Sequence, residues 1–368
     1  MRLLIFHNIL FAQYKSIYFE KLFLEIKRKN GRFLVVQTSY AESSRLNHFS
    51  VPDLIKSIKY PYYLISKKPL EKVSQTVIIV KSIYCILKFK PTIVNFTGYN
   101  TFSTIVLIIL CKVLRIKTIV TSESILSSEK SKNKSIRLFK KLILSIPNYF
   151  YTFGIKANDL LFELGVKKYQ IINFGNTFDK TTFNVPLQVE KPTSEIPQLL
   201  FIGRLIPEKN LMYTLELLSK VNQNIKINFH IYGDGPLNSK IRNKIKEKDH
   251  TFAFLHSSVK WNELPEIYSK FQHLILLSNS ETWGMVANEA CHFNLSVICS
   301  NKCGCANDLI INHKNGLILE SENLNENSKI ITNYLNSYSK NNNFNKRNNL
   351  IFDESYAINR FIQKLYSI

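Results

Sequence analysis

The sequence predicts an α/β fold of two doubly wound domains, each with a parallel sheet covered by helices. Three observations predict it. Short apolar runs alternate with stretches of helical spacing along nearly the whole chain. A proline-containing stretch without apolar periodicity, residues 183–197, interrupts the alternation near the middle. Finally, 368 residues that are 45% hydrophobic are too many for one ordinary core and apolar enough to build two.

The first half alternates strand-like and helix-like segments. Apolar runs predict strands at residues 3–7, 32–37, 92–96, 117–121 and 149–153. Residues that repeat at the spacing of one helix face predict helices at 18–29, 73–89, 101–114 and 136–145. Such alternation is typical of parallel strands joined by helical crossovers.

The second half repeats the pattern after the proline-containing stretch. Strands are predicted at residues 198–202, 226–232, 252–255, 273–277 and 296–299. Helices are predicted at residues 211–221, 237–248, 264–271, 285–292 and 356–366. The Asn-rich stretch 333–349 is interpreted as a mobile polar surface. We therefore expect domains at 1–185 and 196–350, with a C-terminal helix in 351–368 that packs back on the first domain.

The net charge of +22 lies almost entirely in the first half. Residues 1–185 hold 29 Lys and Arg against 10 Asp and Glu, whereas the remainder holds 20 against 17. A basic face of this size attracts nucleic acid, anionic lipid headgroups or lipid-linked phosphates. Spare surface lysines are the simpler alternative.

No segment of the sequence predicts a membrane span or a signal peptide. The longest apolar run, residues 104–111, is ended by Lys112 and Arg115, well short of the roughly 20 residues that a span needs. The six cysteines fit a reduced, cytoplasmic compartment. Cys299, Cys303 and Cys305 lie close in sequence, but their spacing is not that of paired Cys-x-x-Cys zinc ligands.

The first chemical motif is Gly203-Arg204-Leu205 followed by Lys209, directly after a predicted strand. Glycine permits a tight turn, and two cations beside a helix N-terminus suit a diphosphate. An ordinary solvated strand-to-helix turn remains the alternative.

The second motif is a pair of carboxylates, Glu281 and Glu289, eight residues apart around Gly284. Carboxylates accept hydrogen bonds from sugar diols, so two of them near one helix N-terminus could hold a sugar and a ribose. In isolation they could also be a helix charge and a carboxylate favoured by the helix dipole. Residues 233–236, Gly-Asp-Gly-Pro, predict a tight turn. The sequence contains neither a P-loop nor an Asp-x-Asp motif.

Together, in this order on one domain, these motifs resemble glycosyltransferase family 4, of the two-domain GT-B fold. The resemblance covers residues 198–320, including the Glu-x7-Glu element 281–289, Gly304 and Asn315-Gly316. It implies a retaining transferase of surface-polysaccharide or lipid-linked oligosaccharide type that needs no metal and no cofactor. The implied donor is a nucleotide-diphosphate sugar, with UDP preferred.

The resemblance implies a role for each matching residue. Arg204 and Lys209 would neutralise the leaving diphosphate, and their loss would cost on the order of 10²–10³ in turnover. Glu281 would hold the donor sugar and Glu289 the ribose. The implied backbone contacts to phosphate come from Gly203, Gly284, Met285 and Val286.

The N-terminal half departs from the family pattern. Residues 7–15 contain no glycine, and Tyr14-Lys15 stands in the place of a glycine-rich loop. Residues 121–124, Thr-Ser-Glu-Ser, replace a His-containing motif, so Glu123 is either an acid or base near the acceptor or a helix cap. His256-Ser257 stands where relatives often have a glycine, which changes the expected base pocket.

A basic cluster follows Glu123 and suggests how the acceptor is held. It consists of Lys130, Lys132, Lys134, Arg137, Lys140 and Lys141. We expect a polyprenyl-diphosphate-linked glycan acceptor and peripheral contact with the inner face of the cell membrane. A plain solvated basic helix is the alternative. Rival functions are a nucleotide-sugar epimerase on the same scaffold, a polyanion-binding protein and an inactive relative. We expect no nucleic-acid partner, because no recognisable binding motif is present.

Overall fold

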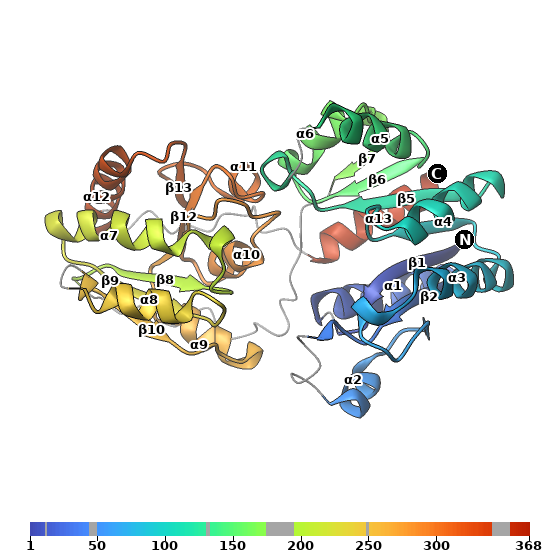
Figure 1. Cartoon of the computed structure of the whole chain (residues 1–368), viewed down its shortest axis with the longest axis horizontal. Helices are drawn as coiled ribbons and strands as arrows, with labels where there is room; N and C mark the ends of the chain where they lie inside the picture. The colour runs from blue at the N-terminus through green and yellow to red at the C-terminus, as the bar shows by residue number, and fades with distance from the viewer. Residues whose placement is uncertain (12, 44–49, 130–132, 174–194, 248–249, 341–353) are drawn as a thin grey trace.

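The computed structural model describes residues 1–11, 13–43, 50–129, 133–173, 195–247, 250–340 and 354–368. The described chain forms two α/β domains, one around each of two parallel sheets (Figure 1). The predicted fold class is therefore confirmed. No helix among the described residues is long and apolar enough to cross a membrane.

The N-terminal sheet has the order β3-β2-β1-β4-β5-β6-β7 in the described part of the chain. Its strands are β1 (Arg2–Ile9), β2 (Arg32–Ser39), β3 (Tyr62–Leu64), β4 (Ile93–Phe96), β5 (Lys117–Ser122), β6 (Tyr149–Thr152) and β7 (Ile171–Asn173). Its helices are α1 (Gln13–Arg28), α2 (Val51–Ser57), α3 (Gln75–Phe89), α4 (Phe102–Val113), α5 (Lys134–Leu144) and α6 (Ile155–Glu163). The order reverses between β1 and β4, and such a switch point opens a crevice at the carboxyl ends of the strands.

The C-terminal sheet has the order β10-β9-β8-β11-β12-β13 within the described residues. Its strands are β8 (Gln198–Ile202), β9 (Asn228–Tyr232), β10 (Ala253–His256), β11 (His273–Leu276), β12 (Ser296–Ser300) and β13 (Gly316–Leu319). Its helices are α7 (Leu211–Asn224), α8 (Asn238–Ile245), α9 (Leu264–Ser269), α10 (Met285–His292), α11 (Ala306–Leu309) and α12 (Leu324–Lys340). Here the switch point falls between β8 and β11.

Three apolar clusters hold these layers together. One lies beneath α3, α4 and α6 in the N-terminal domain, and another lies beneath α7 and α12 in the C-terminal domain. The third covers the other face of the N-terminal sheet and continues into the C-terminal domain through buried side chains such as Trp283 and Leu309. The two domains therefore share part of one core.

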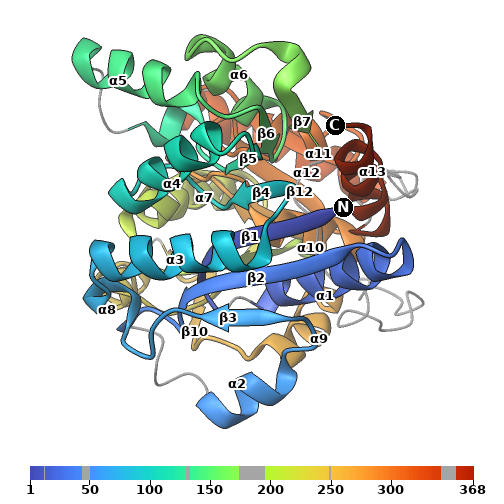
Figure 2. The same cartoon turned by 90° about the vertical axis from the view of Figure 1, so that its right-hand side faces the viewer.

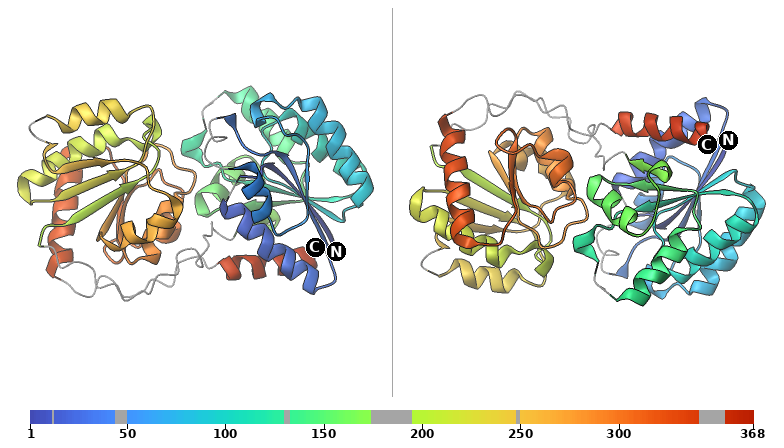
Figure 3. Two further views of the ribbon diagram at one scale, coloured as in Figure 1. Left: turned by 90° about the horizontal axis from the view of Figure 1, so that it is seen from below. Right: turned by 90° about the horizontal axis from the view of Figure 1, so that it is seen from above.

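The last helix, α13 (Glu354–Ser367), lies on the N-terminal domain beside α1, with the two chain ends close together (Figures 1 and 3). Ala357, Ile358 and Phe361 are at most 2% exposed. The Phe361 ring meets the Tyr151 ring edge-on at 5.1 Å. The chain thus leaves the C-terminal domain after α12 and ends on the first domain.

The prediction for the Asn-rich stretch is wrong where the structure describes it. Residues up to Lys340 continue α12, and those from 341 to 349 lie outside the described residues. Ile331, Tyr334 and Leu335 lie on one helix face and are buried against α7, whereas Asn333 and Asn336 are exposed. The asparagines obscured this apolar spacing because they lower helix propensity without preventing a helix that packs through one face.

Candidate active site

The loop after β8 leaves the sheet at the C-terminal switch point. Gly203 and Arg204 follow the strand, and Pro207–Lys209 forms a short 3-10 turn. Asn210 then takes a left-handed conformation with φ 55° and opens α7. The Asn279 N–H donates to the Glu208 carbonyl over 2.8 Å, which ties this loop to the loop after β11. Arg204 remains exposed at the surface of the loop.

Lys209 and Glu281 meet although they are far apart in sequence. The Lys209 Nζ donates to Glu281 Oε2, and the two side chains keep 14% and 16% of their exposure. They meet because β8 and β11 are neighbours and both loops emerge at the same sheet edge. A cation and a carboxylate therefore share the place where the topology puts a ligand.

The loop that carries Glu281 is fixed by the loop after β12. The Gly304 N–H donates to the Glu281 carbonyl over 2.8 Å, and the Cys305 N–H donates to the Trp283 carbonyl over 3.0 Å. A Cβ on residue 304 would lie 1.9 Å from the Thr282 carbonyl oxygen, so only glycine allows this approach. The carboxylate of Glu281 is thus mounted on a rigid backbone.

Helix α10 begins directly after this loop. Gly284 takes φ 101°, a left-handed conformation, and Met285 and Val286 form the first helical turn. The first N–H groups of a helix have no intrahelical acceptor and favour an anion. Glu289, one turn further, is 2% exposed and accepts a hydrogen bond from the Tyr268 hydroxyl over 2.6 Å.

The Gly-Asp-Gly-Pro turn supports the first loop. The Gly203 N–H donates to the Tyr232 carbonyl over 3.0 Å, and the Leu205 N–H donates to the Asp234 carbonyl over 2.8 Å. A Cβ on Gly233 would lie 1.9 Å from the Gly203 carbonyl oxygen. The Gly-Asp-Gly-Pro turn therefore holds the backbone of the Gly203-Arg204 loop in place.

Glu123 lies in the N-terminal domain, just after β5. Its Oε1 is 3.3 Å from Lys15 Nζ, and half of its side chain is exposed. Lys15 also lies over the Phe153 ring, 4.4 Å from its centroid. Ile125, not Glu123, precedes the short 3-10 turn that follows, so the helix-cap alternative is wrong. The acid or base role of Glu123 stays a prediction.

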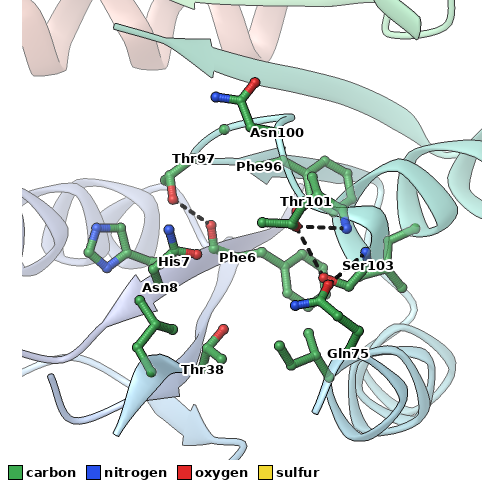
Figure 4. A pocket seen from close by; sticks show the side chains of 15 residues that line it. Phe6, His7, Asn8, Thr38, Gln75, Phe96, Thr97, Asn100, Thr101 and Ser103 are labelled. Carbon is green, nitrogen blue, oxygen red and sulfur yellow. Dashed lines mark hydrogen bonds between the residues drawn. The ribbon is translucent and has the colours of Figure 1, made fainter. Parts of the chain in front are cut away.

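A cavity of about 240 Å³ opens at the N-terminal switch point, between the ends of β1 and β4 and the starts of α3 and α4 (Figure 4). Asn8, Thr38, Gln75, Thr97 and Asn100 supply amides and hydroxyls, while aromatic and aliphatic side chains form the rest of the lining. The Ser103 N–H donates to Gln75 Oε1 over 3.0 Å, which joins the two helix starts.

His7 lines the same cavity and is neutral at physiological pH. Burial, together with the nearby Lys15 charge, lowers the pKa of His7 to about 4. Its Nδ1 lies 2.9 Å from the Ile9 carbonyl oxygen and 3.1 Å from Gln37 Oε1. Since both neighbours are acceptors, Nδ1 carries the proton. The lining of this cavity therefore carries no formal charge.

The basic cluster after Glu123 is less free than its sequence suggests. Lys130 and Lys132 lie outside the described residues. In α5, Arg137 pairs with Glu163 at 2.6 Å and Lys140 pairs with Glu129 at 2.5 Å. These partners reduce the charge that this helix offers to an anion.

Sequence reasoning missed Tyr268 and the residues of the N-terminal cavity. Tyr268 has no motif signal, because only folding brings α9 against α10. Asn8, Thr97 and Asn100, however, follow two predicted strands, so the rule that located Glu281 would have found them. Among the described residues, no group of three or more His, Cys, Asp or Glu side chains could hold a metal, and all six cysteines are free.

The C-terminal half of the chain matches a known family. Residues 187–350 match the model described as glycosyl transferases group 1. The chain is 30% identical over 127 residues to an uncharacterized glycosyltransferase of Methanocaldococcus jannaschii, covering 34% of this chain and 35% of that protein. The chain thus carries a glycosyl transferases group 1 domain.

A Campylobacter jejuni relative has a more specific name. It is GalNAc-alpha-(1->4)-GalNAc-alpha-(1->3)-diNAcBac-PP-undecaprenol alpha-1,4-N-acetyl-D-galactosaminyltransferase, 31% identical over 123 residues. That match covers 33% of each chain, so the chain spans about a third of the length of the curated relatives it matches.

The similarity of fold extends over the whole chain. The Anabaena protein HepE in complex with UDP has a TM-score of 0.76, with 15% identity and all of both chains covered. This likeness identifies the two-domain GT-B fold, as the resemblance implied.

Proposed function

We propose that this protein is a retaining glycosyltransferase that uses a nucleotide-diphosphate sugar, with UDP preferred. It passes the sugar to a lipid-linked or other glycan acceptor in bacterial surface polysaccharide synthesis. The observation that carries the proposal is the meeting of Lys209 and Glu281 at the C-terminal switch point, beside the start of α10. The family match and the names of the two relatives support the transferase class.

In this proposal each group of the donor site contacts a different part of the nucleotide sugar. Lys209, exposed Arg204 and the first N–H groups of α10 stabilise negative charge on the departing diphosphate. Glu281 accepts hydrogen bonds from the donor sugar and Glu289 from the ribose. Because cations and helix N–H groups supply the positive charge, we propose that transfer needs no metal ion and no cofactor.

The acceptor side belongs to the N-terminal domain. The uncharged cavity at β1 and β4 suits a sugar, because amides and hydroxyls bond its hydroxyl groups and aromatic side chains cover its apolar faces. Glu123 faces solvent after β5 and is proposed to orient or deprotonate the acceptor hydroxyl. The basic first half would place the enzyme at the cytoplasmic, inner face of a membrane.

Release of nucleoside diphosphate by the purified protein tests the proposal. UDP- and GDP-sugars are offered with and without a short polyprenyl-diphosphate-linked sugar, each with and without EDTA. We expect acceptor-dependent release that survives EDTA, with the anomeric configuration retained in the product. Loss of release in EDTA would refute the metal-free mechanism, and an inverted product would refute retention.

Two other outcomes favour the rival functions. Conversion of the donor to another sugar nucleotide without acceptor would identify an epimerase. No donor binding at all, with strong salt-dependent binding to polyanions, would favour a polyanion-binding protein and remove the transferase proposal.

A further inference from the structure

A second hollow lies on the other side of the start of α3 and has the opposite character to the uncharged cavity. It has a volume of about 540 Å³ between the end of β3 and α3. Four lysines line it: Lys67, Lys68, Lys72 and Lys81. Ser66 and Ser74 also line it. No Asp or Glu is among the residues that line this hollow.

Two of the groups near the hollow have fixed positions. The Lys81 Nζ donates to the Ile65 carbonyl over 2.6 Å, which holds its ammonium at the wall. The neighbouring carboxylate, Glu71, is turned to Ser43, whose N–H and hydroxyl donate to it at 3.2 to 3.3 Å. A hydrogen bond to its own backbone, together with these bonds from Ser43, lowers the pKa of Glu71. Lys67, Lys68 and Lys72 are exposed.

An apolar stripe continues from the hollow along α3. Val77, Val80, Tyr84 and Leu87 repeat at the spacing of one helix face and are 41%, 61%, 52% and 57% exposed. Val77 also lines the lysine hollow. Helix α3 lies on the outer side of the N-terminal domain, facing the viewer in Figure 2.

We propose that the lysine hollow binds the phosphate or diphosphate that joins the acceptor sugar to its lipid, with the lipid chain along the α3 stripe. This inference rests on the proposed function. Residues 70–78 separate the two hollows, since Leu70, Gln75 and Ile78 line the uncharged cavity while Lys72, Ser74 and Val77 line the basic one. The uncharged cavity, the lysine hollow and the apolar stripe thus lie next to one another around α3. They match the sugar, the phosphate and the lipid chain of the acceptor, respectively. The phosphate is attracted to the lysines and to the start of the helix, whereas the uncharged cavity offers it no cation.

Binding of farnesyl diphosphate, measured by calorimetry with UDP present to fill the donor site, tests the site directly. The test variant is Lys67→Gln with Lys72→Gln, because both side chains line the hollow and are exposed. We expect at least about tenfold weaker binding, since each of the two removed cations contributes a factor of about five. The control, Lys112→Gln with Lys168→Gln, removes the same charge from exposed sites on the same domain, outside both the hollow and the basic cluster after Glu123.

Three probes separate the parts of the site. Farnesol, which lacks phosphate, should bind weakly and equally to wild type and the lysine variant. Inorganic diphosphate should bind more weakly than farnesyl diphosphate and lose affinity in the lysine variant. Val80→Ser with Leu87→Ser should weaken the binding of farnesyl diphosphate and leave the affinity for inorganic diphosphate unchanged. Equal loss in the control variant, or no loss in the lysine variant, overturns the proposal.

A transfer assay separates this inference from the proposed function. With a short polyprenyl-diphosphate-linked sugar, the lysine variant should raise the acceptor KM at least about tenfold and leave kcat and UDP affinity unchanged. With the same sugar as a simple glycoside, variant and wild type should have equal KM. Absence of all transfer, with farnesyl diphosphate still bound through the lysines, would refute the proposed function alone. An unchanged KM would refute the phosphate site alone.

Discussion

At the scale of single residues, the candidate donor site depends on two close backbone approaches, one left-handed glycine and one ion pair. Gly233 allows close contact with the Gly203 loop, and Gly304 allows close contact with the Glu281 loop. Gly284 begins α10, and Lys209 pairs with Glu281. The side chains were visible as motifs in the sequence. Their mutual support was not, because Gly233 and Gly304 are each required by a carbonyl that arrives from another loop, and Gly284 by its left-handed φ.

Lys209→Met should lower turnover on the order of 10²–10³, because a preorganised cation is lost at the leaving diphosphate. The measurement is kcat and KM for nucleoside diphosphate release. Lys302→Met is the matched control, since Lys302 pairs with Glu322 at the surface of the same domain. Equal rates in Lys209→Met and wild type would remove Lys209 from the mechanism.

Gly233→Ala should weaken UDP binding at least about tenfold and destabilise the protein by roughly 1–3 kcal/mol, because the new Cβ strikes the Gly203 carbonyl. UDP titration and thermal unfolding measure the two effects. Gly165→Ala is the control: its φ of 92° carries strain, but its Cβ meets no atom within 4 Å. It should cost about 1 kcal/mol of stability and leave UDP affinity intact.

His7 should titrate near pH 4 by NMR, well below an unfolded histidine near pH 6.5. Because the folded pKa is lower, the unfolded chain takes up a proton first as pH falls. Stability from this group is therefore complete above about pH 6.5 and is lost between pH 6.5 and pH 4. His7→Asn should flatten that part of the stability curve. A His7 pKa at or above 6.5 would contradict a neutral cavity.

At the scale of elements, one helix start joins the two domains. The Ile155 N–H at the start of α6 donates to Asp308 Oδ2 over 3.0 Å, and Gly154 packs against Trp283 and Asp308. The Lys156 Nζ also donates to the Asn301 carbonyl. Burial raises the pKa of Asp308. A carboxylate of one domain thus caps a helix of the other.

Asp308→Ala should cost about 0.5–2 kcal/mol of stability, the usual effect of losing a cap, and should loosen the contact between domains. Thermal unfolding measures the first effect, and small-angle scattering measures the second as a larger radius of gyration. Asp308→Asn keeps an oxygen acceptor and should recover most of both. If scattering of Asp308→Ala matched wild type, the cap would not control domain spacing.

At the scale of the whole molecule, the chain crosses from the second domain back to the first. Helix α12 completes the C-terminal core, and α13 completes the N-terminal one. Five buried apolar side chains attach α13: Ala357, Ile358, Phe361, Ile362 and Leu365. The C-terminal segment of the chain therefore links the two domains, in addition to the surface at which they touch.

Phe361→Ala should destabilise the N-terminal domain by about 3–5 kcal/mol, because a fully buried ring against Tyr151 leaves a cavity. Chemical denaturation followed by fluorescence measures it. Tyr366→Ala, on the same helix but 42% exposed, should cost much less. Equal costs for both variants would contradict the packing of α13 on the first domain.

The sequence alone determined the fold class, the two parallel sheets and the motif-bearing loops of the C-terminal domain. Apolar periodicity and the order of Gly203, Lys209, Glu281 and Glu289 are local signals that survive without coordinates. Only the tertiary structure decided that Lys209 pairs with Glu281, that Tyr268 holds Glu289, and that the two hollows beside α3 differ in charge. Each of these facts depends on strand order and on helices that meet across the sheet, and pairwise contacts between distant segments leave no period or spacing in the sequence.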